Sequence, residues 1–86
     1  MIDNYMLFAN LPVLDLHGEE RNNAIYLVSI FLKDNYKLNN KLLKVIHGKG
    51  EGILKREIYR FLKTNKLVKD YKIDYFNEGV TIIELY

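Results

Sequence analysis

The fold of this chain is decided by the stretch Leu14-Asp15-Leu16-His17-Gly18, in which a short apolar run ends and a helical pattern begins. About thirty residues later, the stretch His47-Gly48-Lys49-Gly50 has the same arrangement, with an apolar run before it and helical spacing after it. Both histidines of the chain therefore stand at strand-to-helix turns. In α/β folds, turns of this kind carry the ligand-binding and catalytic groups.

Hydrophobic spacing on either side of these turns predicts the element order βαβαββ. Leu14 and Leu16 alternate with Asp15 and His17, as residues of a strand do, and the spacing then changes to a helical period. The same change follows the second apolar run, and two alternating runs end the chain. The expected elements are strands at 13–17, 42–47, 68–76 and 80–86, helices at 19–36 and 54–65, and a hairpin loop at 77–79 in which Gly79 supplies a positive φ.

This order predicts an α/β fold class, of the α+β two-layer sandwich type. A strand, a helix and a strand form a right-handed crossover between parallel strands, and the last hairpin makes the four-stranded sheet mixed. Two helices cover only one face of such a sheet. The other face is expected to be partly open, covered by the N-terminal arm through Met6, Leu7 and Phe8, or covered by a second subunit. The chain is thus expected to be a monomer or a weak homodimer.

Length and composition limit the classes of protein that remain. The 86 residues predict one domain, with an N-terminal arm at 1–12 and the domain itself at 13–86. Cysteine is absent, so disulfides and thiolate metal sites are excluded. No apolar run reaches the ~20 residues of a membrane span, and the first six residues include no basic group, which argues against a signal peptide. We expect a cytoplasmic protein with no membrane partner. We also expect a stand-alone protein, with a domain trimmed from a longer chain as the alternative.

The second turn has the composition of a phosphate-binding loop. Gly48 and Gly50 have no side chain to keep a phosphate from the backbone, and Lys49 between them is a mobile positive charge. The N-termini of both helices, whose free N–H groups attract anions, are expected at the same edge of the sheet. Lys55 and Arg56 follow the turn and are further candidates for phosphate contacts. The alternative interpretation is a plain turn followed by a solvated helix face.

Asp15, His17 and His47 are the candidate catalytic residues. Asp15 and His17 are two residues apart on a strand and share a face, so the carboxylate is expected to orient the imidazole and raise its pKa. His47 on the neighbouring strand is a second candidate for proton transfer. Two histidines around one phosphate suit phosphodiester cleavage, because one deprotonates the nucleophile and the other protonates the leaving oxygen. The alternative is that the histidines are structural and that Asp15 caps a backbone amide.

The chain resembles the Smr (small MutS-related) domain over residues 13–86. The resemblance is carried by the motifs Leu-Asp-Leu-His-Gly and His-Gly-Lys-Gly and by the closing run 79–85. The resemblance implies a fold similar to the C-terminal domain of bacterial translation initiation factor 3, nucleic-acid binding and, in several members, endonuclease activity on DNA or RNA. Carried over by position, the first motif gives Asp15 and His17, and the second gives His47, Gly48 and Gly50. Smr chains commonly have a longer glycine-rich stretch before the last strand than residues 77–79 provide.

Three hypotheses follow for the function. The first is a nucleic-acid-binding endonuclease that uses the 2′-hydroxyl of RNA as nucleophile, or activates water on DNA with the help of a divalent ion (Mg²⁺ or Mn²⁺). Asp15, His17 and His47 are the potential ligands of such an ion, although this spacing is a weak metal signal. The second hypothesis is a non-catalytic module that binds branched DNA, structured RNA or a ribosome. The third is an oligomerisation domain. Tyr71 and Tyr75 share a strand face and are candidates for base stacking, with packing as the favoured alternative.

Overall fold

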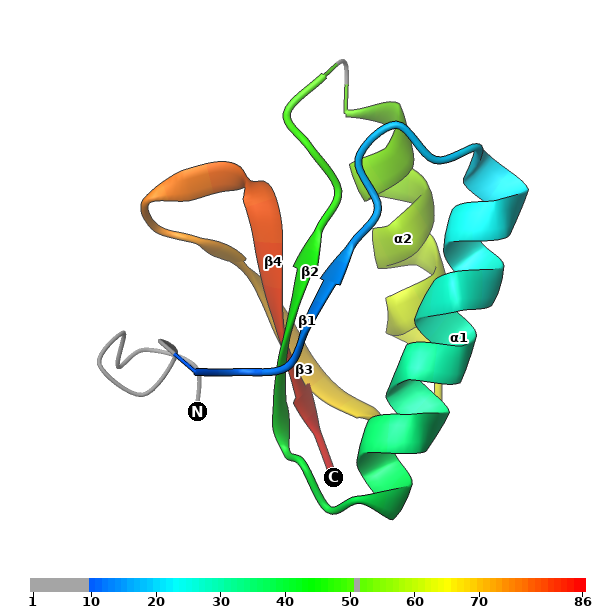
Figure 1. The fold of residues 1–86 in the computed structure, drawn as a ribbon, viewed down its shortest axis with the longest axis vertical. Coiled ribbons are helices and arrows are strands. Elements are labelled where there is room, and N and C mark those ends of the chain that lie inside the picture. Colours follow the sequence, from blue (N-terminus) through cyan, green and yellow to red (C-terminus); the bar gives the residue numbers. More distant parts are fainter. Residues whose placement is uncertain (1–9, 51) are drawn as a thin grey trace.

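The computed structural model describes residues 10–50 and 52–86, and the described elements follow the expected order βαβαββ (Figure 1). Both predicted helices and all four predicted strands are present, with boundaries shifted by a few residues. The first strand ends at Asp15 rather than at His17. The elements are β1 (Val13–Asp15), α1 (Arg21–Lys37), β2 (Leu42–Ile46), α2 (Ile53–Thr64), β3 (Val68–Asp74) and β4 (Asn77–Leu85).

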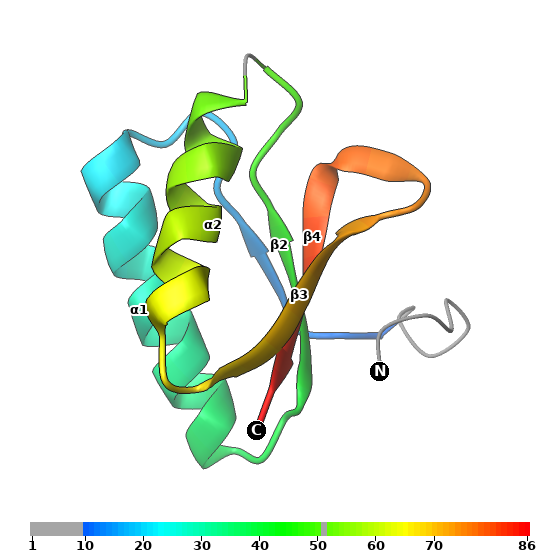
Figure 2. The same cartoon turned by 180° about the vertical axis from the view of Figure 1, so that it is seen from behind.

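The four strands form one mixed sheet in the order β1-β2-β4-β3. β1 and β2 are parallel, as the crossover through α1 requires, and β4 runs antiparallel to both β2 and β3. Both helices lie on the same side of the sheet, which Figures 1 and 2 show from opposite directions. The predicted two-layer α+β fold is therefore confirmed. The parallel pair brings the carboxyl ends of β1 and β2, and the turns that follow them, to one edge of the molecule.

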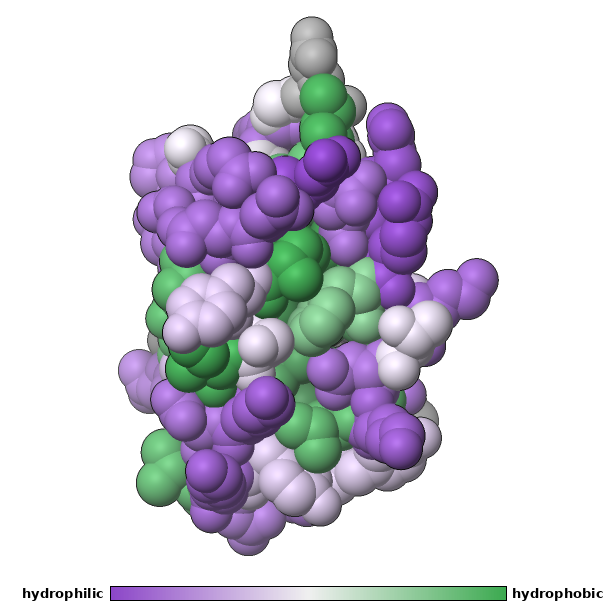
Figure 3. All heavy atoms as spheres, turned by 90° about the vertical axis from the view of Figure 1, so that its right-hand side faces the viewer, coloured by the Kyte–Doolittle hydropathy of each residue, from purple (hydrophilic) through white to green (hydrophobic). Residues whose placement is uncertain are grey.

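The main core lies between the sheet and the helices because the strand residues alternate in direction. In β2, Leu43 and Val45 are fully buried against the helix layer. On the outer surface of that layer, hydrophilic side chains cover a large part of the view and hydrophobic ones show between them (Figure 3). The buried core consists of Leu16, Ala24, Val28, Leu32, Leu43, Val45, Ile58, Leu62, Ile83 and Leu85.

The helices have exposed polar faces, and their N-termini differ. α2 has an exposed basic stripe, which is formed by Arg56, Arg60 and Lys63. α1 begins after Glu20, whose own carboxylate caps it, whereas α2 begins after Gly52, which has no side chain to do so. Within residues 10–50 and 52–86, neither helix combines the length and the apolar character needed to cross a bilayer.

A second, smaller apolar cluster lies on the sheet face away from the helices. Val80 and Ile82 of β4 are its buried members, at 5% and 1% exposure, and Leu11, Leu42 and Ile46 pack against them. The expected cover from Met6, Leu7 and Phe8, like most of the expected arm at 1–12, lies outside the described residues.

The last hairpin differs from the prediction. Its turn is formed by Tyr75 and Phe76, not by residues 77–79, and Asp74 pairs with Asn77 across it. The Asp74 carboxylate accepts a hydrogen bond of 2.9 Å from the Phe76 amide, so a local side-chain contact closes the turn. Gly79 consequently lies inside β4, without the positive φ that a loop position would need. The prediction was wrong because Asn, Glu and Gly are rare in strands and read as a loop.

Candidate active site

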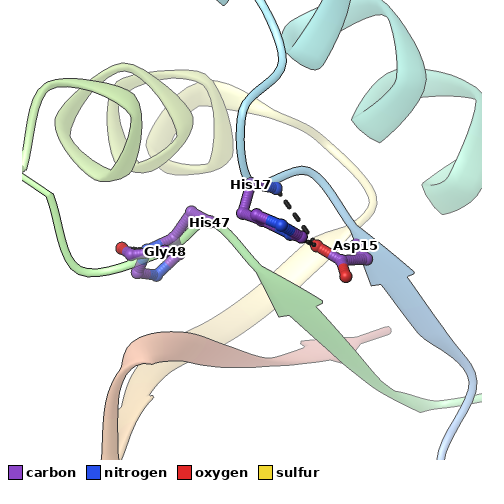
Figure 4. A network of polar contacts seen from close by, with 4 residues as sticks. All are labelled: Asp15, His17, His47 and Gly48. Atoms are coloured by element: carbon purple, nitrogen blue, oxygen red, sulfur yellow. Dashed lines mark hydrogen bonds and ion pairs between the residues drawn. The ribbon is translucent and has the colours of Figure 1, made fainter.

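The first turn holds an exposed pair of acid and histidine. Nδ1 of His17 lies 2.7 Å from Oδ1 of Asp15, and the same oxygen accepts a hydrogen bond of 3.1 Å from the His17 amide (Figure 4). The hydrogen bond to Asp15 and its negative charge raise the pKa of His17, while the hydrogen bonds from His17 lower the pKa of the Asp15 carboxyl. Because an ionised carboxylate only accepts, Nδ1 carries the hydrogen. Nε2 is therefore the basic nitrogen of the neutral ring.

The second turn holds a histidine in a different environment. His47 is only 4% exposed, and burial lowers its pKa, so the neutral ring is favoured. Its Nδ1 lies 3.0 Å from the carbonyl oxygen of Gly48, and its Nε2 lies 2.8 Å from Oγ1 of Thr81. The hydroxyl of Thr81 is in turn 3.0 Å from the hydroxyl of Tyr59.

The protonation of this buried chain follows from its acceptors. Nδ1 must carry the hydrogen of the neutral His47 ring, because the Gly48 carbonyl can only accept. Nε2 then accepts from the Thr81 hydroxyl, which leaves the Thr81 oxygen to accept from Tyr59; hydroxyl hydrogens rotate to suit such a chain. Both ring nitrogens of His47 are thus engaged within the fold. His47 ties β2 to β4 and α2 and fixes the carbonyl of the glycine turn.

The two imidazoles lie on opposite faces of the sheet. His47 continues the alternation of Leu43 and Val45 toward the helices, whereas Asp15 and His17 alternate with the core residue Leu16 and lie on the other side. In Figure 4 the ring of His17 is directed toward Asp15, and the ring of His47 lies away from this pair. The structure thus brings Asp15 and His17 together but does not direct both imidazoles toward one phosphate.

Gly79 joins the two turns to β4, and sequence reasoning missed this role. Its carbonyl accepts hydrogen bonds from the amides of both His47 (2.9 Å) and Gly48 (3.0 Å). A β-carbon at position 79 would lie 3.1 Å from the Gly48 carbonyl carbon and 3.2 Å from its Cα. Gly48 in turn packs against His17, whose Cβ would be 3.4 Å from a β-carbon at position 48. A glycine inside an alternating strand pattern is the signal for such a close backbone approach.

A hollow of about 220 Å³ lies between the two turns and the N-terminus of α2. The positive φ of Gly48 and Gly52, +85° and +80°, lets the backbone of the glycine turn fold around it. Lys49 and Lys55, both predicted phosphate contacts, line the hollow, whereas Arg56 does not. The lining residues are Gly18, Glu19, His47, Gly48, Lys49, Gly50, Gly52, Ile53, Leu54 and Lys55.

Only one of the two helix N-termini at this edge suits an anion. The Glu20 carboxylate accepts hydrogen bonds from the amides of Asn22 (2.9 Å) and Asn23 (3.2 Å), so α1 already holds a negative group at its positive end. The amide of Gly48 is also occupied, by Gly79. The expectation of anion attraction at both helices is therefore corrected to α2, whose N-cap Gly52 has no side chain.

The predicted metal ligands do not converge. Asp15 and His17 bond to each other, and His47 bonds to Gly48 and Thr81 on the other face of the sheet. Among residues 10–50 and 52–86, no three His, Asp or Glu side chains are grouped so that they could hold a metal ion.

The described features define a class: small α+β domains in which an Asp–His pair and a glycine-rich turn meet at the carboxyl ends of two parallel strands. The sequence model of the Smr domain matches residues 14–86. The chain therefore belongs to the Smr domain family. It is 41% identical over 75 residues to Endonuclease MutS2 of Clostridium acetobutylicum, and 37% identical over 75 residues to that of Geobacillus kaustophilus. Each alignment covers 84% of this chain, which spans about a tenth of the length of these curated relatives.

Two solved structures have the same fold. The Smr domain of Thermus thermophilus MutS2 superposes with a TM-score of 0.86 at 28% identity, covering 88% of this chain and 99% of that domain. YdaL, a stand-alone small MutS-related protein from Escherichia coli, gives a TM-score of 0.84 at 19% identity, covering 92% of this chain and 70% of that one. The chain is thus homologous to the Smr domain of the MutS2 endonucleases.

Replacing Asp15 with asparagine is expected to lower the pKa of His17. The substitution replaces a charged acceptor with a neutral amide oxygen, so both the charge and the charge-assisted hydrogen bond that raise this pKa in the wild type are lost. Two-dimensional NMR of the ring carbons against pH measures the pKa directly, without an activity assay. His47 is the internal control, because its burial does not depend on Asp15, and its titration should not move. An unchanged His17 titration would contradict the pairing.

Replacing Thr81 with valine is expected to destabilise the fold by about 1–3 kcal/mol, because it leaves Nε2 of the buried His47 without its donor. Valine has nearly the same shape as threonine, so packing changes little. Urea denaturation followed by circular dichroism gives the free energy of unfolding. Thr81→Ser, which keeps the hydroxyl, is the matched control and should retain the hydrogen-bond contribution. Equal stability of the valine variant and the wild type would show that the chain from Tyr59 to His47 contributes nothing.

Proposed function

We propose that this Smr domain binds nucleic acid and cleaves its phosphodiester bonds as an endonuclease. The observation that carries the proposal is the exposed Asp15–His17 pair, which directly precedes Gly18 and Glu19, two residues that line the hollow at the uncapped end of α2. A proton-transfer group thus comes immediately before a site for a phosphate along the chain. Homology to the Smr domain of proteins named Endonuclease MutS2 supports the same function.

In the proposed mechanism, His17 is the general base. Its Nε2 takes the proton of a nucleophile, which is the 2′-hydroxyl in RNA or a water molecule on DNA. The deprotonated oxygen attacks phosphorus, and the bond to the leaving 5′-oxygen breaks; that oxygen takes a proton from solvent. Asp15 stabilises the imidazolium that forms and keeps the ring oriented. Lys49, Lys55 and the first amides of α2 offset the charge that develops on the phosphate oxygens.

A non-catalytic binding module is the second candidate, and one observation favours it. His47, the expected second proton-transfer group, has both ring nitrogens bonded within the fold. The described edge then offers one histidine for proton transfer where two were expected, while the lysines and the end of α2 remain suited to binding. Such a module would hold structured RNA, branched DNA or ribosomal RNA through its phosphates.

Cleavage of labelled single-stranded RNA and branched DNA by the purified chain, with and without EDTA, separates the two candidates. Internal cleavage products that persist in EDTA are expected for acid–base chemistry on RNA. Binding that weakens with salt, without cleavage of either substrate, would establish the binding module in place of the endonuclease. Cleavage that EDTA abolishes would contradict the mechanism above, in which His17, Asp15 and the lysines act without a metal ion.

Replacing Lys55 with glutamine is expected to weaken nucleic-acid binding and to reduce its dependence on salt. Each lysine–phosphate contact releases counterions, so the slope of log affinity against log salt should fall by about one on duplex DNA. Fluorescence anisotropy at several salt concentrations measures both quantities. Lys63→Gln on the exposed stripe of the same helix is the matched control with equal net charge. If the two variants lose the same affinity, Lys55 acts only through the overall charge.

A further inference from the structure

A second, larger hollow of about 640 Å³ adjoins the first and extends to the β3–β4 hairpin. The two hollows share four residues of the glycine turn and the start of α2, so they form one continuous surface path. This path runs from the first turn, past the end of α2, to the hairpin. The shared residues are Lys49, Gly50, Gly52 and Lys55, and the larger hollow is also lined by Lys72, Ile73, Asp74, Tyr75 and Glu78.

The charges in the larger hollow favour an anion along most of its length. Lys49, Lys55 and Lys72 contribute three positive charges, against two negative charges from Asp74 and Glu78. The Asp74 carboxylate is held in place by the Phe76 amide at 2.9 Å and serves the hairpin turn. The lysines of the glycine turn and α2 lie at one end of the path, and Lys72 lies near the hairpin at the other. Two phosphates of one strand would thus find positive charge at both ends.

Aromatic side chains complete the hairpin end of the hollow. Tyr75 is 73% exposed and Phe76 is 85% exposed, which is unusual for such large apolar rings. Their ring centroids are 6.5 Å apart, and Nζ of Lys72 lies 5.6 Å from the centroid of Tyr75. Tyr71, the other candidate for base stacking, packs edge-on against Tyr59 at 5.0 Å, in line with the favoured alternative of packing. Of the two stacking candidates, only Tyr75 lines the larger hollow.

We propose that the larger hollow is a subsite for one unpaired nucleotide, whose base stacks on Tyr75. The phosphate on one side of this nucleotide lies at Lys49 and Lys55, and the phosphate on the other side lies at Lys72. An aromatic ring beside a basic groove recognises single strands without regard to sequence, because every base has a π-face. A base inside a duplex cannot offer that face. The inference rests on the proposed function and narrows its substrate to strands with an unpaired nucleotide next to the scissile phosphate.

The test compares Tyr75→Leu and Tyr75→Phe with the wild type by fluorescence anisotropy. The probes are a labelled thymidine oligodeoxynucleotide of about twelve residues, within the range of single-strand site sizes, and a labelled blunt duplex. DNA is used because it lacks the 2′-hydroxyl, so RNA-type cleavage does not consume the probe. Tyr26→Leu is the matched control, because Tyr26 is a largely exposed tyrosine (62%) on α1 that lines neither hollow. Circular dichroism verifies that each variant is folded.

We expect Tyr75→Leu to weaken single-strand binding roughly tenfold, as loss of one stacked base does, and to leave duplex binding unchanged. Tyr75→Phe and Tyr26→Leu should bind the single strand as the wild type does. Wild-type affinity in Tyr75→Leu, or an equal loss for single strand and duplex, overturns the subsite. Tyr75-dependent binding without any cleavage of RNA or branched DNA supports the subsite and overturns only the endonuclease. A wild type that binds neither probe overturns the subsite and the binding function together.

Discussion

Replacing His17 with alanine is expected to lower the rate of phosphodiester cleavage by about 10²–10⁴-fold, the usual contribution of a positioned general base. The affinity for nucleic acid should change little, because the lysines and the end of α2 remain. Single-turnover cleavage of labelled RNA, with enzyme in excess, measures the rate separately from binding. The side chain of His17 is 71% exposed, so its removal should leave the fold intact.

The pH dependence of cleavage gives this prediction a second readout. A general base acts in its neutral form, so the rate should rise with pH and level off above the raised pKa of His17. In Asp15→Asn this rise should move to lower pH, because the pKa of His17 falls when the carboxylate is lost. Wild-type activity in His17→Ala, or a pH profile that Asp15→Asn leaves unmoved, would refute the role of the pair.

The fold was predictable because local spacing and topology agree. Leu14 and Leu16 on one side, and Leu43 and Val45 on the parallel neighbour, specify which strand faces meet the helices. The change from a two-residue to a helical period then places both turns at the same edge. The pairing of Asp15 with His17 was predicted from strand alternation, although β1 ends at Asp15 and the pair is closed by a local contact in which Asp15 also accepts from the His17 amide. The same change of period thus predicts both the strand faces that meet the helices and the edge at which the two turns lie.

The role of His47 was not predictable from its motif, although its side of the sheet was. The alternation that buries Leu43 and Val45 also carries His47 toward the helices, while His17 follows the opposite alternation in β1. The sequence did not show that the hydroxyl group of Thr81 lies next to Nε2 of His47, or that the hydroxyl group of Tyr59 lies next to Thr81. Thr81 is 34 positions away along the chain, and the register of β2 against β4 brings it to His47. Tyr59 reaches Thr81 from α2, which packs on the sheet.

Replacing Gly79 with valine is expected to destabilise the domain by about 1–3 kcal/mol, as overpacking of a well-packed site does. The added β-carbon would stand 3.1 Å from the backbone of Gly48, where no side chain can move aside. Valine otherwise favours strands, so a loss of stability would reflect the contact and not the propensity. Urea denaturation measures the change in free energy of unfolding.

The same substitution should also reduce cleavage in the fraction that remains folded. The carbonyl of Gly79 accepts hydrogen bonds from the amides of His47 and Gly48, and Gly48 packs directly against His17. A displaced Gly48 would therefore move the glycine turn relative to the Asp15–His17 pair. Glu78→Val is the matched control for stability, because it places the same side chain one residue earlier in β4 at an exposed position and should change stability by no more than ~0.5 kcal/mol. If the two valine variants unfold at the same urea concentration, the close approach of β4 to the glycine turn is not what requires a glycine at position 79. If Gly79→Val is less stable but cleaves at the wild-type rate where it is folded, the position of the turn is not critical for the chemistry at His17.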